Sequence, residues 1–341
     1  MKKNLFYLLI LMVLAAVAYF AFKKDEPLFA RDDANFKIEN TSDITKIFLS
    51  DPGVGNIKLT KNSDGVWIVN DKYRARQDWV VFLLEGMAQQ NATQMVPKSA
   101  HNTTVKALAG NSVKVEVFQG DKKTHAYFVA KDPSRDNLTV MLNIKEDGTN
   151  APRPFLVSCG HGGTFLGVRY RTDIEDWRDK RIFLFASDEL STIEIEYPKK
   201  PEASFTINMQ PKPAVLPSLD TGTVNELRLK KYLSFYDKLF CMGFENDYIL
   251  KDTFVRAFEP FAKVKVTASD GESHSLSTYY RQVNKTTHNV ITVNGKQYDG
   301  DSFFGLYDNE DFMLISSLTA QKILRERQEF FTAEKTVTPA N

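Results

Sequence analysis

Hydrophobic and polar residues follow a similar order of patterns in the two halves of the chain. In the first half they alternate over residues 44–49, 57–60 and 66–69, which is typical of short antiparallel strands. Apolar residues then recur at helical spacing from Asp78, and alternation returns at 113–117. Further strands are expected at 126–129, 139–142 and 154–157. The first half therefore predicts a β-meander, a helix and a second set of strands.

The second half begins with alternation at 190–197, and 204–207 is the expected partner strand. A helix is predicted from Thr223, which with Glu226 fits a capping box, and its apolar stripe extends to Phe240. More strands are expected at 264–267, 277–280 and 290–293, and a last helix over Ser317 to Phe330.

Corresponding elements of the two halves lie at nearly constant distances along the chain. Ile44 precedes Leu190 by 146 residues, Asp78 precedes Thr223 by 145, and Val113 precedes Val264 by 151. This regularity predicts a tandem duplication. The alternative is that two unrelated α+β domains share a common order of strands and helix.

An uncharged apolar run extends from Leu5 to Phe22, with lysines on both sides. Eighteen helical residues reach about 27 Å, close to the hydrocarbon thickness of a bilayer. We therefore expect a transmembrane signal-anchor over residues 1–24, with the rest of the chain exported. Cleavage after Ala16-Val17-Ala18 is the alternative, although the residues that follow this site remain apolar.

The amino-acid composition of the chain excludes several classes of protein. The 341 residues include 44 Lys and Arg against 43 Asp and Glu, and 43% of them are hydrophobic. This excludes a disordered chain, leaves room for about two domains, and provides no basic excess for binding nucleic acid. The two cysteines, Cys159 and Cys241, cannot build a disulfide framework.

The predicted organisation has a linker at 25–35 and α+β repeats at 36–173 and 182–330, followed by a polar tail at 331–341. A connection at 174–181 carries charges of both signs between the repeats. Its cluster is predicted to form an interaction surface or an ion-paired brace between the repeats, and consists of Asp176, Trp177, Arg178 and Asp179.

Candidate catalytic groups have simpler structural explanations. Cys159 and His161 suggest a nucleophile and a base, but their segment is better explained as a glycine-rich turn between strands. Glu194 and Glu196 share one face of a strand, as expected of its solvent side. Trp67 suits a hydrophobic core better than a binding surface. The chain has neither a nucleophile elbow nor a phosphate-binding loop motif.

Metal-ligand patterns are also missing from the sequence. The five histidines show no HxxxH or HxH spacing, and two isolated cysteines cannot complete a zinc site. The segment Asp299-Gly300-Asp301 begins like a calcium loop, but Phe303 occupies the next ligand position. We expect no metal and no cofactor.

Three segments resemble a bacterial family, the domain-of-unknown-function family 4340. They are Ile44-Thr45-Lys46-Ile47, the stretch from Trp67 to Arg76, and the stretch from Asp176 to Phe183. The resemblance implies N-terminally anchored envelope proteins with repeated α+β units, some of them encoded near ABC-type transporters. It implies no catalytic residues.

We therefore expect an α+β protein with an N-terminal transmembrane helix and two similar β-meander/helix/sheet domains in tandem. It would be a non-enzymatic accessory or scaffold protein of a transport or surface machinery. We expect a single-pass protein of the inner membrane, mostly in the periplasm, with a protein partner that could be an ABC-type transporter. The alternative is a hydrolase-like envelope enzyme whose site forms only in the folded chain.

Overall fold

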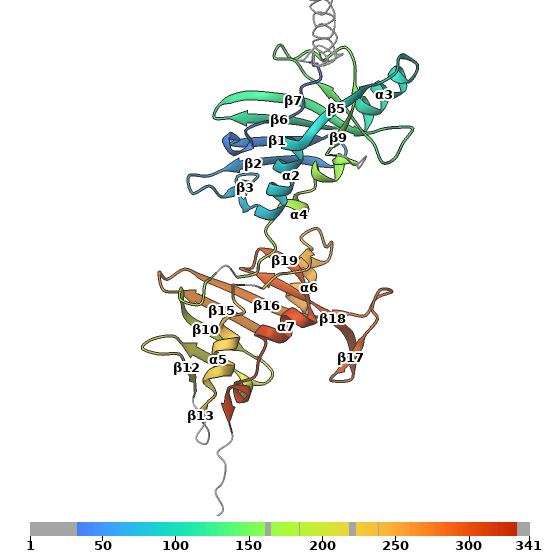
Figure 1. Ribbon diagram of the computed structural model, residues 1–341. Coiled ribbons are helices and arrows are strands. Elements are labelled where there is room, and N and C mark those ends of the chain that lie inside the picture. The colour runs from blue at the N-terminus through green and yellow to red at the C-terminus, as the bar shows by residue number, and fades with distance from the viewer. Residues whose placement is uncertain (1–32, 161–164, 184, 218–222, 238, 333–341) are drawn as a thin grey trace, which may run out of the picture. The chain divides into compact units, whose positions relative to one another are not determined.

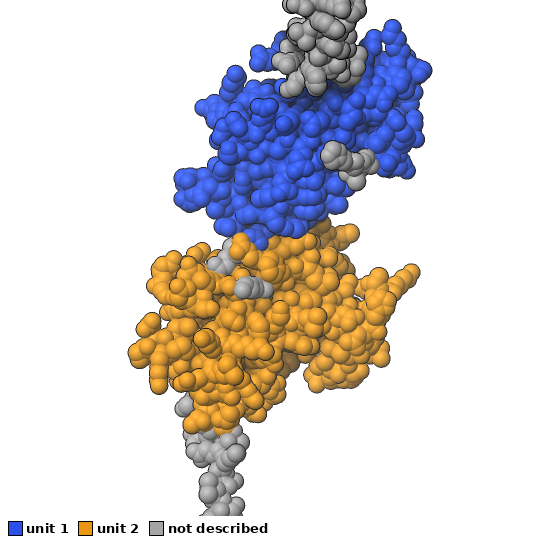
Figure 2. Space-filling model, viewed as in Figure 1, with its two compact units in different colours: residues 1–179 blue, residues 180–341 orange. Residues whose placement is uncertain are grey.

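The structure is a computed structural model that describes residues 33–160, 165–183, 185–217, 223–237 and 239–332 (Figure 1). The chain divides into two compact units, Met1–Asp179 and Lys180–Asn341 (Figure 2). Each unit contains a large antiparallel sheet of its own.

Unit 1 is built on a nine-stranded sheet in the order β4-β3-β2-β1-β6-β7-β8-β9-β5. Its strands are β1 (Lys46–Asp51), β2 (Gly55–Lys61), β3 (Trp67–Val69), β4 (Tyr73–Arg74), β5 (Gln90–Met95), β6 (Val113–Gln119), β7 (Lys122–Lys131), β8 (Thr139–Asn143) and β9 (Phe155–Cys159). In the centre, Ile47 lies opposite both Leu59 and Val117, so these side chains share one buried face.

Alternation along the strands of unit 1 gives the sheet two apolar faces. The larger core packs against α2 (Gln77–Gln89), which buries Leu83 and Met87 against the sheet. The opposite face carries a smaller cluster that includes Leu108 of α3 (Lys98–Gly110). The short helices of this unit are η1 (Thr41–Asp43), η2 (Leu166–Arg169) and α4 (Ile174–Trp177).

Unit 2 has a sheet in the order β12-β11-β10-β15-β16-β18-β19-β14, with β17 paired to β18 outside this path. Its strands are β10 (Leu190–Glu196), β11 (Phe205–Asn208), β12 (Ala214–Leu216), β14 (Gly243–Phe244), β15 (Ala262–Ala268), β16 (Ser273–Gln282), β17 (Val290–Val293), β18 (Lys296–Tyr307) and β19 (Asp311–Ser316). A third, two-stranded sheet pairs β13 (Thr223–Val224) with β20 (Phe331–Thr332).

The sheet of unit 2 is also covered on both faces. The larger core includes residues of α5 (Glu226–Leu233) and α7 (Ser317–Ile323), and Phe330 of η4 (Arg327–Phe330). A smaller aromatic cluster on the other face holds Phe254 of α6 (Lys251–Ala257) against Phe304 and Phe312. The remaining short helix is η3 (Pro201–Ala203).

The strand order of unit 2 corresponds to that of unit 1 when β4 and β17 are set aside. In each unit one helix precedes an edge strand, β5 or β14, and a second helix follows it. This is a correspondence of topology. The tandem duplication expected from the sequence offsets stays a prediction.

The predicted α+β class is wrong, because the described residues are mostly β-sheet: 40% of them are strand and 23% helix, and their strands form three antiparallel sheets. The helix predicted from Thr223 to Phe240 is only eight residues long. Thr223 lies in β13 instead, and Asn225 caps the helix by accepting a hydrogen bond from the Arg228 amide. Similarly, the helix predicted from Ser317 ends at Ile323.

The predicted transmembrane helix is not among the described helices. Among the residues that the structure describes, no helix is long and apolar enough to cross a bilayer. The segment Leu5 to Phe22 and the predicted signal-anchor at 1–24 lie outside the described residues. At the other end, Phe331 and Thr332 belong to β20 rather than to a polar tail, and 333–341 are not described.

Candidate functional site

The charged cluster predicted at residues 176–179 lies in unit 1, and Trp177 is its most buried member. Asp173 begins α4 by accepting a hydrogen bond from the Glu175 amide. The Trp177 side chain is 0% exposed within the main core, and its indole Nε1 donates to the Arg171 carbonyl at 2.8 Å. Trp177 is therefore a core residue of unit 1.

Arg178 and Asp179 join the same segment to β4. The Arg178 guanidinium lies 3.7 Å from the centre of the Tyr73 ring, and the residue is 4% exposed. The Asp179 amide donates to the Arg74 carbonyl at 2.9 Å, and its carboxylate lies 3.5 Å from the Arg74 Nε. These contacts fasten the segment to the sheet edge of its own unit.

Asp176 is the more accessible member of the cluster, with 34% of its side chain exposed and an ion pair to Arg171 at 3.2 Å. The predicted role of the four residues, as an interaction surface or as an inter-repeat brace, stays a prediction. A partner would reach Asp176 more easily than Trp177 or Arg178.

Cys159 lies at the end of β9, where it is half-buried, and its Sγ is 3.4 Å from the Gln89 Oε1. His161 lies outside the described residues, so the structure gives no geometry for a Cys–His pair. Cys241 is buried in the core of unit 2.

We expect Cys159→Ser to leave function unchanged and to change the free energy of unfolding by less than about 1 kcal/mol. The residue is half-exposed at the edge of the core, and its thiol donates one weak hydrogen bond. His161→Ala should likewise leave function unchanged. Denaturant unfolding and partner crosslinking of both variants would check this. Loss of function in a folded Cys159→Ser protein would indicate a reactive thiol.

The other sequence candidates fit structural roles. Glu194 and Glu196 are exposed on β10, and they pair with Lys265 at 3.7 Å and Lys263 at 3.3 Å. Trp67 is 5% exposed in the core of unit 1. Within the described ranges, no group of three or more His, Cys, Asp and Glu residues could hold a metal ion.

Asp299 belongs to a buried hydrogen-bond network rather than to an open loop. Its side chain is 3% exposed, and Oδ2 accepts from the Arg281 guanidinium at 2.9 Å. Its Oδ1 accepts from the Asp301 amide at 2.8 Å. Asp299 therefore organises the start of β18, where β17 and β18 form a hairpin.

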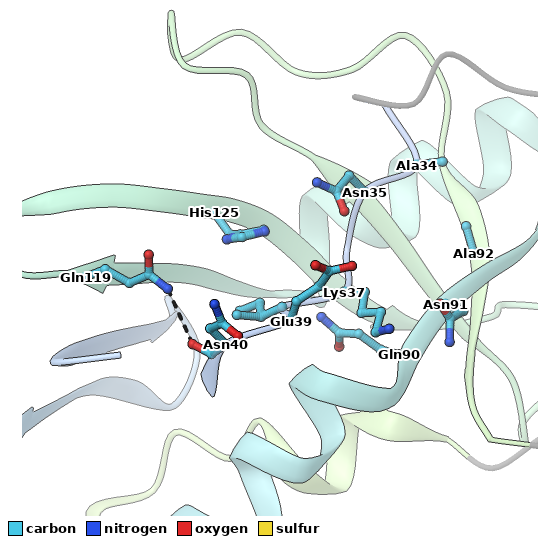
Figure 3. A pocket seen from close by; sticks show the side chains of 11 residues that line it. Ala34, Asn35, Lys37, Glu39, Asn40, Gln90, Asn91, Ala92, Gln119 and His125 are labelled. Atoms are coloured by element: carbon cyan, nitrogen blue, oxygen red, sulfur yellow. Dashed lines mark hydrogen bonds between the residues drawn. The ribbon is translucent and has the colours of Figure 1, made fainter. Parts of the chain in front are cut away.

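A polar depression of about 460 Å³ lies in unit 1 (Figure 3). Its side chains come from the segment before β1, from β6 and β7, and from the junction of α2 with β5. Burial lowers the pKa of His125 on the wall of this depression, and a hydrogen bond that the imidazole donates to the Lys37 backbone opposes this shift. Near neutral pH, His125 is therefore an uncharged polar group.

Gln90 lies at the base of this depression and is 0% exposed. Its amide nitrogen donates to the Phe36 carbonyl and contacts the Tyr127 hydroxyl at 3.1 Å. Its Oε1 accepts from the Tyr170 hydroxyl at 2.6 Å, and the two tyrosine hydroxyls lie 3.2 Å apart. The side chain thus has satisfied hydrogen bonds and supports the core.

The same network predicts sensitivity to alkaline pH. Burial raises the pKa of Tyr127 to about 12, and burial also raises the pKa of Tyr170. Above about pH 10, tyrosines ionise in the unfolded chain but stay neutral in the folded one. We expect the free energy of unfolding to fall as the pH rises from about 10 to 12, less steeply in Tyr127→Phe. Urea titrations followed by tryptophan fluorescence would measure both slopes, and equal slopes would contradict this.

An aromatic pocket of about 670 Å³ lies in unit 2. Phe261 and Tyr280 form its stacked wall with ring centres 4.3 Å apart, and Tyr298 continues this wall 4.9 Å from Tyr280. Charged side chains surround the rings: Lys199 pairs with Glu259 at 3.7 Å, Lys200 pairs with Glu326 at 2.7 Å, and Lys296 completes the rim. Aromatic walls with a few polar groups are typical of binding pockets.

A second pocket of unit 2, of about 410 Å³, shares Ala257 and Phe258 with the first. Its apolar rim is accessible to solvent: Leu250 is 55% exposed, Phe258 40% and Val283 42%. Ile249, next to this rim in sequence, is 97% exposed. We call Ile249, Leu250, Phe258 and Val283 the apolar patch.

The arrangement that most resembles catalytic chemistry is centred on His274. Its Nδ1 lies 2.6 Å from Asp308, and its Nε2 lies 3.2 Å from Glu272. Ser275 donates its hydroxyl to Asp308 rather than to the imidazole. Both ring nitrogens are therefore engaged by carboxylates, which leaves neither to activate a nucleophile in this conformation.

The aromatic pocket and the pocket beside the apolar patch were not predicted from the sequence. The aromatic wall combines Phe261, which directly precedes β15, with residues of β16 and β18, and the rim adds residues from beyond β10 and α7. The aromatic density of 254–261 and 279–280 was the available signal, but the spacing of these residues does not bring them together.

Comparisons with known proteins found no match for the chain. No family model matches the chain, and neither a curated protein nor a solved structure matches it. The resemblance to the domain-of-unknown-function family 4340 therefore stays a prediction, neither supported nor refuted.

Proposed function

We propose that the chain is a non-enzymatic accessory component of a cell-envelope machinery and acts by binding another protein. The observation that carries this proposal is the apolar patch beside the pocket of α6. Leu250, Phe258 and Val283 line one pocket and remain 40–55% exposed.

Contiguous exposed apolar side chains are uncommon on monomeric proteins unless they bind a partner. Scattered ones are normal, such as Leu318, which is 72% exposed on α7. The patch differs because its side chains surround a hollow that also contains Tyr248 and Phe304. A partner that fills this hollow would remove apolar surface from water, which favours association.

We place this contact in the periplasm, with an ABC-type transporter as the proposed partner. This part of the proposal rests on the sequence resemblance and on the apolar amino-terminal run, followed by a long hydrophilic chain. Added protease should digest the chain in spheroplasts with intact membranes, whereas protection would contradict an exported location.

Patch variants test the contact directly. Leu250→Glu and Phe258→Glu each place a charge on the patch, so we expect each to reduce crosslinking to a partner in intact cells at least tenfold. Leu318→Glu is the matched control, because it adds the same charge at an exposed leucine outside the patch.

Circular dichroism would confirm that the variants are folded. Equal crosslinking in the patch variants and in Leu318→Glu would reject the patch as the contact. Recovery of only the single chain from the unaltered protein would reject the protein-binding function itself.

A further inference from the structure

The β17–β18 hairpin projects from the sheet of unit 2 (Figure 1). A two-residue turn joins its strands, with Asn294 at φ 49° and Gly295 at φ 75°. Both residues occupy left-handed conformations, as a type I′ turn requires. We call residues 290–298 the arm.

One edge of the arm is open. Among the described strands, β17 pairs with β18 alone. Val293 and Lys296, which flank the two-residue turn, form a hydrogen-bonded pair. Hydrogen-bonded and non-hydrogen-bonded pairs alternate along an antiparallel hairpin, so Thr292 and Val290 belong to non-hydrogen-bonded pairs. The backbone N–H and C=O groups of Thr292 and Val290 therefore point outward, where another strand can pair with them.

The arm also carries its own apolar face. Ile291 lies opposite Tyr298, and Val293 lies opposite Lys296, so these four side chains share one face. Val293, Lys296 and Tyr298 line the aromatic pocket. A strand added beside β17 would direct alternate side chains toward this face.

Charge on the arm favours an acidic partner over a second copy of the chain. Lys296 is exposed and has no ion pair with a described residue, and Lys285 is exposed nearby in the sequence. Around the pocket, three lysines face two glutamates. Two arms in contact would bring these lysines together, which costs energy, whereas an acidic segment would pair with them.

We propose that β17 binds an extended acidic segment of another protein by strand addition, with alternate apolar side chains entering the aromatic pocket. This proposal rests on the proposed protein-binding function and specifies the chemistry of the partner. Backbone hydrogen bonds along the open edge would contribute affinity, and the pocket and Lys296 would contribute selectivity.

Three fluorescein-labelled decapeptides test this by fluorescence anisotropy with the whole chain. The first alternates valine and glutamate, the second alternates valine and lysine, and the third alternates proline and glutamate. We expect the first to bind at least tenfold more tightly than the others, because the second has the wrong charge and the third lacks half of the strand donors.

Variants of the arm then locate the binding. Thr292→Pro removes an outward N–H and should weaken binding of the valine–glutamate peptide at least tenfold, whereas Thr292→Val keeps the N–H and should bind normally. Lys296→Glu should reverse the preference toward the lysine peptide. Lys122→Glu changes an exposed lysine of unit 1 in the same way and should leave the peptide preference unchanged.

Several results would overturn the proposal: no binding of the valine–glutamate peptide, equal binding of the proline peptide, an unchanged preference in Lys296→Glu, or formation of a dimer that Thr292→Pro abolishes. The charge reversal stays informative even if Thr292→Pro disturbs the arm. If the peptide did not bind but crosslinking in cells still depended on the apolar patch, strand addition would be rejected and the protein-binding function would stand.

Discussion

Trp177→Ala should lower the free energy of unfolding of unit 1 by about 3–5 kcal/mol, the range for removing a fully buried tryptophan. The side chain is 0% exposed among the sheet and helix residues of the core. Its removal leaves a cavity and also leaves the Arg171 carbonyl without the indole donor. We expect unit 1 to unfold at a much lower denaturant concentration.

Tryptophan fluorescence can report this unfolding selectively, because Trp67, Trp79 and Trp177 all lie in unit 1. Asp176→Ala is the matched control on the same short helix, and it should cost less than about 1 kcal/mol, since its ion pair is partly exposed. If the two variants were equally stable, Trp177 would be accessible in solution, and its predicted role as an interaction surface would gain support.

Strands with one buried face were predictable from the sequence. Alternation at 57–60 and 113–117 corresponds to β2 and β6, where apolar residues point into the core and polar ones point away. The helical spacing after Asp78 corresponds to α2. Each of these segments buries one face, so its apolar residues recur at the period of a strand or of a helix.

Other strands carry no such signal. On β18, Phe304 and Leu306 face the smaller cluster, and Phe303 and Tyr307 pack against the larger core. Burial on both faces produces a continuous apolar run without alternation. At the sheet edge, β5 is largely polar, so its pairing with β9 depends on the fold rather than on its own pattern. Such strands explain why the α+β class was wrong.

The amphipathic stripe after Thr223 shows the opposite error. Tyr236 and Leu239 are both 0% exposed in the core of unit 2, as a continued helix would also predict. The helix nevertheless ends at Leu233, and both side chains reach the same core from positions beyond its end. Helical spacing records which residues are buried, and it cannot distinguish a long helix from a short one followed by a loop.

The pockets depend on tertiary structure still more strongly. Phe258 directly follows α6, Phe261 directly precedes β15, and Tyr298 belongs to the arm. Neighbours in the sequence can also pack differently, since Tyr279 packs in the smaller cluster whereas Tyr280 stacks on Phe261. Aromatic content could therefore suggest a binding surface in this region, but not its location.

The largest effect in unit 2 should come from Asp299→Ala, which we expect to cost about 3 kcal/mol. Removing one member of a buried ion pair leaves the other charge without its partner. The Arg281 side chain is 23% exposed, so water compensates for part of this loss. The variant also removes acceptors for the Thr287 and Ser302 hydroxyls and for the Asp301 amide.

Because Asp299 lies opposite Val290 at the base of the arm, its loss should loosen β17 before the rest of the sheet. Hydrogen exchange of the β17 and β18 amides would measure this, and binding of the valine–glutamate peptide should weaken in parallel. Asp301→Ala is the control, because among the described residues this exposed carboxylate accepts only from the Asn289 amide, at 3.1 Å. If hydrogen exchange at the arm became faster in Asp299→Ala while the peptide affinity stayed the same, binding would not depend on an ordered arm. That result would contradict strand addition at β17.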